Sequence, residues 1–176
     1  MIRFYVWECG VDSLPPEIDL HRLDVEIWRP KILSVRPKGL PFIPNVVWWV
    51  FHHFGIFSNR ELGIVNLRKG SRIVHSLLAT PRYFRFANMG LNDLQIGAVF
   101  TDPHWRGLGL AKAAIRIVCV EWAGRFSRLW YIVGEDNIPS IRVIEACGFR
   151  LAGTGDRVNR LGLPLLGQYR ILNPTV

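Results

Sequence analysis

The chain is organised around one stretch, residues 94–111, which reads LQIGAVFTDPHWRGLGLA. Leu94 to Thr101 has the pattern of a strand, and it runs into a proline turn and a loop that contains two glycines. A helix predicted over Leu108 to Trp122 opens from this loop. The first backbone N–H groups of a helix have no partner within the helix, and the helix dipole adds positive character there. Because Gly107 and Gly109 leave room for a ligand against this backbone, the stretch predicts a pyrophosphate site.

The same stretch has an alternative interpretation, because a strand–helix turn that binds nothing can also contain glycines. No Lys-Ser or Lys-Thr pair follows the glycines, as a Walker motif requires, and the spacing does not match G-x-G-x-x-G. Glycine spacing alone therefore leaves a ligand-free turn and a phosphate site both open.

Downstream of this stretch the sequence predicts a second strand and a second helix. Leu129 to Val133 is typical of a buried strand, and Asn137 to Cys147 has helical spacing, with Pro139 in the first turn and Gly148 beyond the end. Two strands joined by a long helix are expected to be parallel neighbours with a right-handed crossover. The other predicted elements are strands at Ile2–Glu8, Glu61–Leu67, Arg72–Ala79, Phe149–Thr154 and Leu165–Leu172, a short helix near Leu20–Ile27, and a helix that Asn45 caps and that ends near Gly55.

Length and composition fit one globular domain of 176 residues, with 49% hydrophobic residues and a net charge of +8. A basic surface rich in Arg attracts polyanions such as a nucleotide cofactor, nucleic acid or an anionic membrane, although genome composition and solubility explain it equally well. Three cysteines without metal-ligand spacing suit a reducing cytoplasm, and Cys119 and Cys147 are expected to be buried. We expect no signal peptide, because the N-terminus alternates like a strand and lacks a cationic start followed by an apolar region. We expect no transmembrane segment, because the apolar run from Val46 to Phe57 contains two histidines and is too short.

Two motifs in the correct order resemble those of the Gcn5-related N-acetyltransferase (GNAT) family. Residues 106–111, RGLGLA, fit the family signature, and Thr101-Asp102-Pro103 precedes them at the family's spacing. Asn137, then Ser140 three residues later, and Gly148-Phe149 match the second element. The resemblance covers roughly residues 60 to 155. It implies a mixed α/β (α+β) single domain, with a mostly antiparallel sheet in which two splayed parallel central strands are flanked by helices.

The resemblance also implies acetyl-coenzyme A (acetyl-CoA) as co-substrate. The strand that ends at Thr101 would carry a bulge, and pantetheine would enter the gap beside it and pair with the backbone of Val99 and Thr101. The Val99 N–H could stabilise the developing oxyanion. Asn137 would hydrogen-bond the pantetheine, although a helix N-cap would also place an Asn there. The implied cofactor residues are Val99, Phe100, Thr101, Arg106, Gly107, Leu108, Gly109, Leu110, Ala111, Asn137 and Ser140.

The acid and base of such a reaction are harder to place. Many relatives have a Tyr acid seven residues after the Asn, but this chain has Ile144, so another acid such as Tyr131 or unassisted departure of the thiolate is required. We list Asp93, Gln95 and His75 as candidate bases, with Asp93 and His75 preferred as catalytic residues. A turn residue and a packed core histidine are the structural alternatives for these two.

The acceptor is the least determined part. Aromatic residues interleaved with Arg at 82–86, and a helix with paired Trp and paired His at 48–53, could stack on a sugar and hold a phosphate, which favours an amino sugar or nucleotide-linked sugar. The same residues could simply pack on the sheet, contact a membrane surface, or serve a protein-amine acceptor. A catalytically silent acetyl-CoA sensor is a second class, and the apolar composition disfavours a third, an RNA-binding domain. A homodimer is common among relatives. Within the single domain, we expect residues 1–60 to form the acceptor side, residues 61–155 the acetyl-CoA-binding core and residues 156–176 a C-terminal strand.

Overall fold

A computed structural model describes residues 1–8, 14–15, 17, 19–20, 22–160 and 163–175. All eight strands belong to one sheet, in the order β2-β3-β4-β5-β6-β1-β7-β8. Only β5 and β6 run parallel, and the other neighbours are antiparallel. The strands are β1 Ile2–Glu8, β2 Asp24–Trp28, β3 Gly63–Lys69, β4 Arg72–Pro81, β5 Leu94–Thr101, β6 Arg128–Gly134, β7 Arg150–Arg160 and β8 Leu163–Pro174; the helices are α1 Phe42–His53, α2 Leu110–Glu121 and α3 Ile138–Ala146. This is the predicted mixed α/β class.

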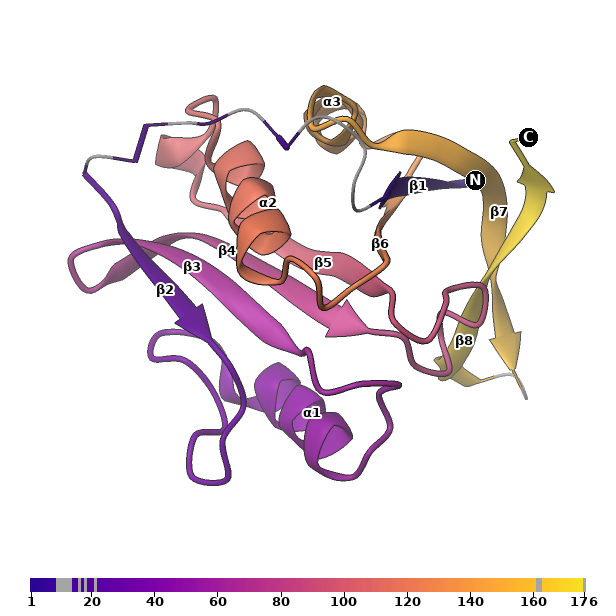
Figure 1. Cartoon of the computed structure of the whole chain (residues 1–176), viewed down its shortest axis with the longest axis horizontal. Helices are drawn as coiled ribbons and strands as arrows, with labels where there is room; N and C mark the ends of the chain where they lie inside the picture. Colours follow the sequence, from indigo (N-terminus) through magenta and orange to yellow (C-terminus); the bar gives the residue numbers. More distant parts are fainter. Residues whose placement is uncertain (9–13, 16, 18, 21, 161–162, 176) are drawn as a thin grey trace.

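The helices cover opposite faces of the sheet. Figure 1 shows α2 and α3 on one side and α1 on the other. The alternation of β4 divides its side chains between two cores, because successive residues of a strand point to opposite faces. Leu77 packs in a cluster with α2 and α3 residues such as Ile115, whereas Leu78 packs in a second cluster with Trp48 of α1.

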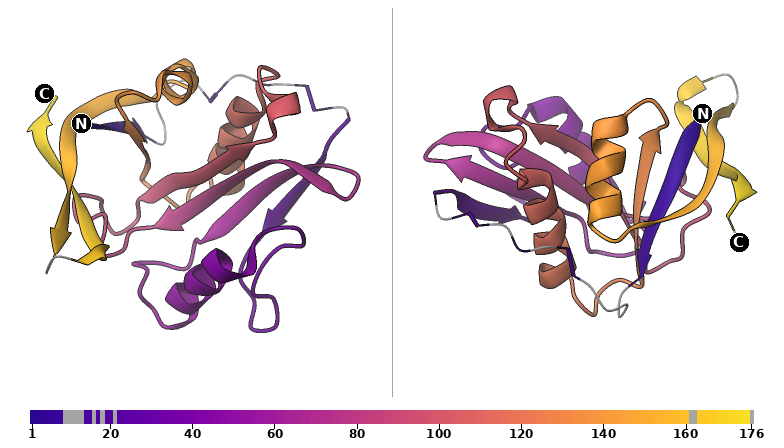
Figure 2. Two further views of the ribbon diagram at one scale, coloured as in Figure 1. Left: turned by 180° about the vertical axis from the view of Figure 1, so that it is seen from behind. Right: turned by 90° about the horizontal axis from the view of Figure 1, so that it is seen from above.

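The first strand lies in the middle of the sheet, far from its neighbours in sequence. β1 pairs antiparallel with β6 on one side, where Phe4 faces Ile132, and with β7 on the other. Figure 2 shows this strand in indigo between β6 and β7. Phe4 and Tyr5 are fully buried, so β1 contributes to both cores although its pairing depends on residues more than a hundred positions away.

The predicted bulge and splay of the central strands are confirmed. The register of β4 with β5 shifts between Ser76 and Leu78, and Ala98 takes a φ of 47°, the one non-glycine with positive φ in the described part of the chain. The parallel ladder of β5 with β6 runs from Leu94 opposite Leu129 only to Ile96 opposite Tyr131. Beyond the bulge the two strands therefore separate, and their backbone groups are no longer paired with each other.

Two sequence predictions for the first 60 residues are wrong. The stretch near Leu20–Ile27 does not form a helix, because Asp24–Trp28 is strand β2 and pairs with β3 from Ile64 to Arg68. Its backbone gains ladder hydrogen bonds with β3, and its alternating side chains gain a partner face that no local pattern reveals. Asn45 does not cap α1 either: the helix starts after Pro41, and the Asn45 amide donates back to the Pro41 carbonyl at 2.7 Å.

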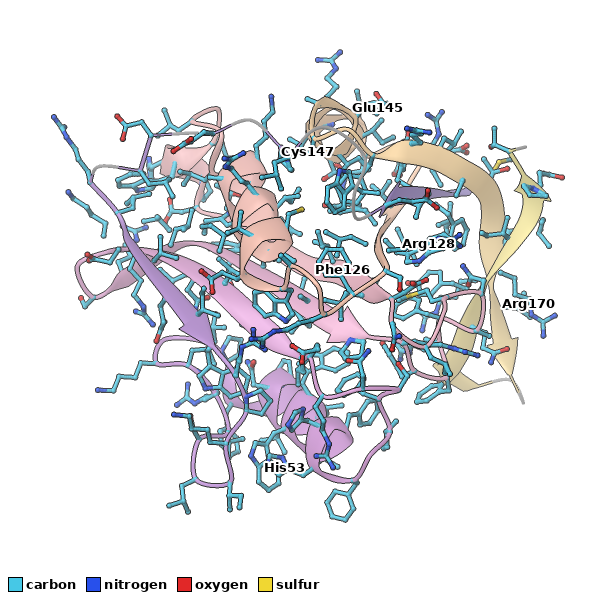
Figure 3. All side chains as sticks on the ribbon, in the orientation of Figure 1. His53, Phe126, Arg128, Glu145, Cys147 and Arg170 are labelled. Atoms are coloured by element: carbon cyan, nitrogen blue, oxygen red, sulfur yellow. The ribbon has the colours of Figure 1, made fainter. Side chains whose placement is uncertain are left out.

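Within the described residues, no helix has the length and apolar character needed to cross a membrane. Cys119 and Cys147 are buried, as predicted, and Cys9 lies outside the described residues. Figure 3 labels Cys147 at the end of α3. Burial raises the pKa of its thiol to about 11, which keeps the thiol protonated and unreactive at neutral pH.

Candidate functional site

A cavity of about 720 Å³ lies where β5 and β6 separate. Its wall combines the end of β5, the first turn of α2, the first turn of α3 and Tyr131 of β6. All of the predicted cofactor residues except Leu108 line this first cavity, and the Leu108 side chain is exposed. The motifs at 99–111 and 137–140 are far apart in sequence, so the cavity results from the parallel crossover that carries them to the same edge of the sheet.

The first turn of α2 presents unpaired backbone amides to this cavity. Gly109 at the N-cap has a φ of 76° and Gly107 has a φ of 78°, backbone angles that residues with a side chain rarely adopt. No described side chain caps the helix, and the amides of Leu110 and Ala111 donate to no described group. The preceding turn is held in place by Asp102, whose carboxylate accepts from the His104 amide at 3.0 Å and pairs with Arg72. The helix start is thus rigid, open and positive, which suits an anion.

Asn137 and Ser140 form the opposite wall at the start of α3. The Asn137 side-chain oxygen accepts from the Ser140 amide at 3.3 Å, so the N-cap interpretation of Asn137 is confirmed. This contact uses the oxygen and leaves the Asn137 amide nitrogen without a partner among the described residues. The capping contact therefore fixes a hydrogen-bond donor at the cavity.

Two cations and one phenol at the cavity extend the predicted set of cofactor residues. Arg106, Lys112 and Arg142 line it, of which only Arg106 was predicted. Lys112 and Arg142 come one turn into helices that begin at the cavity, a position that could have identified them from the sequence. Tyr131 is buried in the core, yet it also lines the cavity. Burial raises the pKa of Tyr131, so its hydroxyl stays protonated and can donate a hydrogen bond.

The predicted bases occupy buried positions outside the cavities described here. The Asp93 carboxylate accepts from the Gly90 amide and from the Trp130 indole, both at 2.7 Å. Gln95 is buried and accepts from the Thr80 hydroxyl at 3.1 Å. His75 is fully buried beside Thr101, and burial lowers its pKa to about 4. The imidazole is therefore neutral at pH 7 and a weak base there.

The position of the missing acid is occupied by the core. Ile144 is fully buried in the cluster that joins α3 to the sheet. Its side chain contributes to packing and has no group that could protonate a thiolate.

A second cavity of about 700 Å³ lies on the α1 face of the sheet and meets the first at the bulge. Phe100 lines both cavities, and Ala98 lines the second. Its other walls are mainly apolar and come from the start of α1, the preceding loop and strands β3 and β4, including Leu40, Trp48, Ile64, Ile73 and Leu78. Its polar lining residues are Asn45, Ser71, Arg72 and Ser76. No carboxylate or histidine is among them, so a cationic ligand would find no countercharge in this cavity.

The predicted acceptor aromatics are divided between different places. Trp48 lines the second cavity, whereas Tyr83 and Phe86 are buried in the core on that face. Burial raises the pKa of Tyr83 to about 12. Arg82 and Phe84 reach only a separate hollow of about 380 Å³. The remaining members are Trp49 and His53, whose tilted rings have centroids 4.3 Å apart on α1, His52, which is half-buried beside them, and Arg85 in the 82–86 loop.

Comparison with known proteins agrees with this geometry. Residues 27–149 match the model of the acetyltransferase (GNAT) family. The structure is similar to a tandem GNAT protein from the clavulanic acid biosynthesis pathway, solved without AcCoA, with a TM-score of 0.58 and 12% identity over 88% of this chain and 54% of that chain. It is also similar to a GNAT-family acetyltransferase from Colwellia psychrerythraea (TM-score 0.53, 13% identity, 86% and 53% coverage). A GCN5-related N-acetyltransferase from Kribbella flavida gives a TM-score of 0.50, with 16% identity and 85% and 53% coverage.

These identities are low enough that the structural likeness shows the fold alone. The chain spans about half the length of these solved structures. Among curated proteins, none matches the sequence.

Proposed function

Because the chain belongs to the acetyltransferase (GNAT) family, we propose that it transfers an acetyl group from acetyl-CoA directly to an amine of a small molecule. One observation carries this proposal: the unpaired amides at the start of α2 and the separated edges of β5 and β6 line the same cavity. The amides offer a site for the diphosphate, and the free strand edge offers backbone partners for the amides of pantetheine.

The charges and hydrogen-bond donors around the first cavity support a cofactor that places its diphosphate at the start of α2 and its pantetheine along β5. Arg106, Lys112 and Arg142 bring positive charge to the end that would receive phosphates. Asn137 and Ser140 would contact the pantetheine. The acetyl carbonyl would then lie near the bulge, where the Val99 amide is a candidate donor to the oxyanion.

The acid and base remain proposals. Asp93 and His75 are still the proposed bases. Their observed contacts are structural, so a chain of water molecules would have to connect either group to the amine. The Tyr131 phenol is the lining residue best suited to protonate the departing thiolate, since it is neutral and close to the splay. Each of these assignments makes a separate prediction for a conservative variant.

The second cavity supports a small-molecule acceptor. It reaches the bulge from the face opposite α2, so an amine in it and a thioester in the first cavity would meet at Ala98 to Phe100. Its apolar walls favour an amine with an apolar body. The amino-sugar prediction rested on residues 82–86 and on the helix at 48–53, and of these only Trp48 lines this cavity. A protein amine is the alternative acceptor, and residues 1–60 would then supply its docking surface.

A thermal-shift titration with acetyl-CoA tests the cofactor site. We expect stabilisation of the native chain, and its loss in Gly109→Trp, because the new side chain would occupy the diphosphate position. Gly124→Trp is a matched control, since Gly124 has a φ of 74° and open space around it but lies in an exposed turn away from the cavity. Equal stabilisation of both variants by acetyl-CoA would contradict a diphosphate site at the start of α2.

Release of free thiol from acetyl-CoA in the presence of a panel of amines tests the activity. Turnover with an amine supports the transferase, whereas cofactor binding without turnover favours the sensor alternative. We place the reaction in the cytoplasm, and the free, buried thiol of Cys147 is consistent with a reducing compartment.

A further inference from the structure

The segment between β2 and β3 combines exposed apolar side chains with uncompensated positive charge. Residues 29–60 contain five Lys and Arg residues and no Asp or Glu. Of these, Arg29 pairs with Glu61, whereas no ion pair of the described residues involves the other four. The large exposed hydrophobic residues of this segment are Ile32, Leu33, Phe42, Ile43, Val47, Phe54 and Ile56.

Helix α1 packs part of its apolar surface against the sheet and turns another apolar stripe outward. Ile43, Val47, Val50 and Phe54 are spaced four, three and four residues apart, so they form one stripe along the helix and its end. Ile43 and Phe54 are 78% and 75% exposed, while Asn45 is the one buried residue of the helix. Figure 3 shows side chains of this helix, with His53 labelled, extending away from the sheet. A helix that only packs on its own domain carries polar residues on its outward face, so this exposed apolar stripe departs from that pattern.

The loop before α1 extends the same surface. Lys31 and Ser34 form an isolated bridge, which places Ile32 and Leu33 at the tip of a tight turn. Leu33 is 97% exposed. The Trp49 indole donates to the Lys31 carbonyl at 2.9 Å and so fastens this turn to α1. The apolar tip, the stripe and the exposed cations Lys31, Arg36 and Lys38 together form what we call the α1 surface.

We propose that the α1 surface docks the protein onto an anionic lipid bilayer. Apolar side chains enter the interface, and the surrounding cations meet lipid phosphates. A second copy of the chain is a poorer occupant, because a two-fold interface brings the same patch against itself and would place its cations opposite one another. The start of α1 also lines the second cavity, so docking would hold that cavity close to the lipid. The docking itself does not depend on the proposed acetyl transfer.

Co-sedimentation with vesicles tests the proposal. We expect the full chain to pellet with phosphatidylcholine vesicles that contain phosphatidylglycerol, much less with phosphatidylcholine alone, and less at high ionic strength. Leu33→Ser combined with Phe54→Ser should lower the bound fraction at least about tenfold. Leu91→Ser combined with Val120→Ser is the matched control, because these two side chains are 65% and 50% exposed elsewhere.

Stabilisation of each variant by acetyl-CoA shows that it is folded, and this measurement separates a failure of docking from a failure of the cofactor site. Equal binding to both kinds of vesicle, or equal loss in the two double variants, would overturn the proposal. So would sedimentation equilibrium showing a dimer that the Leu33/Phe54 double variant converts to a monomer.

Discussion

His75 and Thr101 join the middle of β4 to the last residue of β5, with 2.8 Å between His75 Nδ1 and Thr101 Oγ1. The contact lies directly behind the bulge, and the other imidazole nitrogen is buried without a partner among the described residues. The histidine therefore supports the cofactor strand from within the core.

This contact predicts a loss of stability in acid. Burial lowers the His75 pKa from 6.5 to about 4. Between these values the unfolded chain binds the proton more readily than the folded chain, so stability falls as the pH falls. We expect His75 to contribute a loss of roughly 2 kcal/mol between pH 7 and pH 5. Urea unfolding of the native chain and of His75→Gln checks this, because the variant should lack that part of the pH dependence. The same pH slope in both proteins would contradict the assignment.

Tyr131→Phe tests the phenol as the acid. Tyr131 lines the first cavity and is buried in the core, and the change removes one oxygen atom, so the variant should fold and bind acetyl-CoA. We expect kcat to fall about 100-fold with little change in the KM for acetyl-CoA, the usual scale for loss of a general acid. An unchanged kcat would mean that the thiolate leaves without help from this residue. Tyr169→Phe is a suitable comparison, because Tyr169 stacks on Phe86 at 5.4 Å on the other face and lines neither main cavity.

Ser76→Leu tests the acceptor cavity. Ser76 is 6% exposed and lines the second cavity but not the first. A larger side chain should reduce the room for the amine and raise its KM about tenfold, while stabilisation by acetyl-CoA stays intact. Steady-state kinetics with the best amine of the panel measures the effect. Ser127→Leu, at an exposed position before β6, should change neither value.

Gly63→Ala tests the packing that holds the sheet against α2. A Cβ at Gly63 would collide with the Trp122 indole, which is fully buried and donates to the Glu61 carbonyl at 2.9 Å. We expect a loss of about 1–3 kcal/mol in the free energy of unfolding. Denaturant unfolding of the double variant with Trp122→Phe provides the control, because the smaller ring removes the collision. Its destabilisation should be less than the sum of the two single losses.

The sequence could predict the cofactor half of the site because that half is local. A strand, a proline turn, two glycines and a helix start follow one another within residues 94–111, so the unpaired amides are a consequence of neighbouring residues. Asn137 and Ser140 belong to another helix start of the same kind. In both places the chemistry depends on backbone groups that a short motif determines.

The tertiary structure decided the rest, because the relevant partners lie far apart in the chain. Residues 24–28 became a strand only through pairing with β3, and β1 found its place between β6 and β7. Asn45, Ser76 and Phe100 meet around the second cavity only once α1 has packed across the sheet. The same packing leaves one stripe of α1 without a partner among the described residues. Burial set the pKa of His75 and the accessibility of Tyr131. Because burial depends on contacts between residues far apart in the chain, no local pattern contains that information.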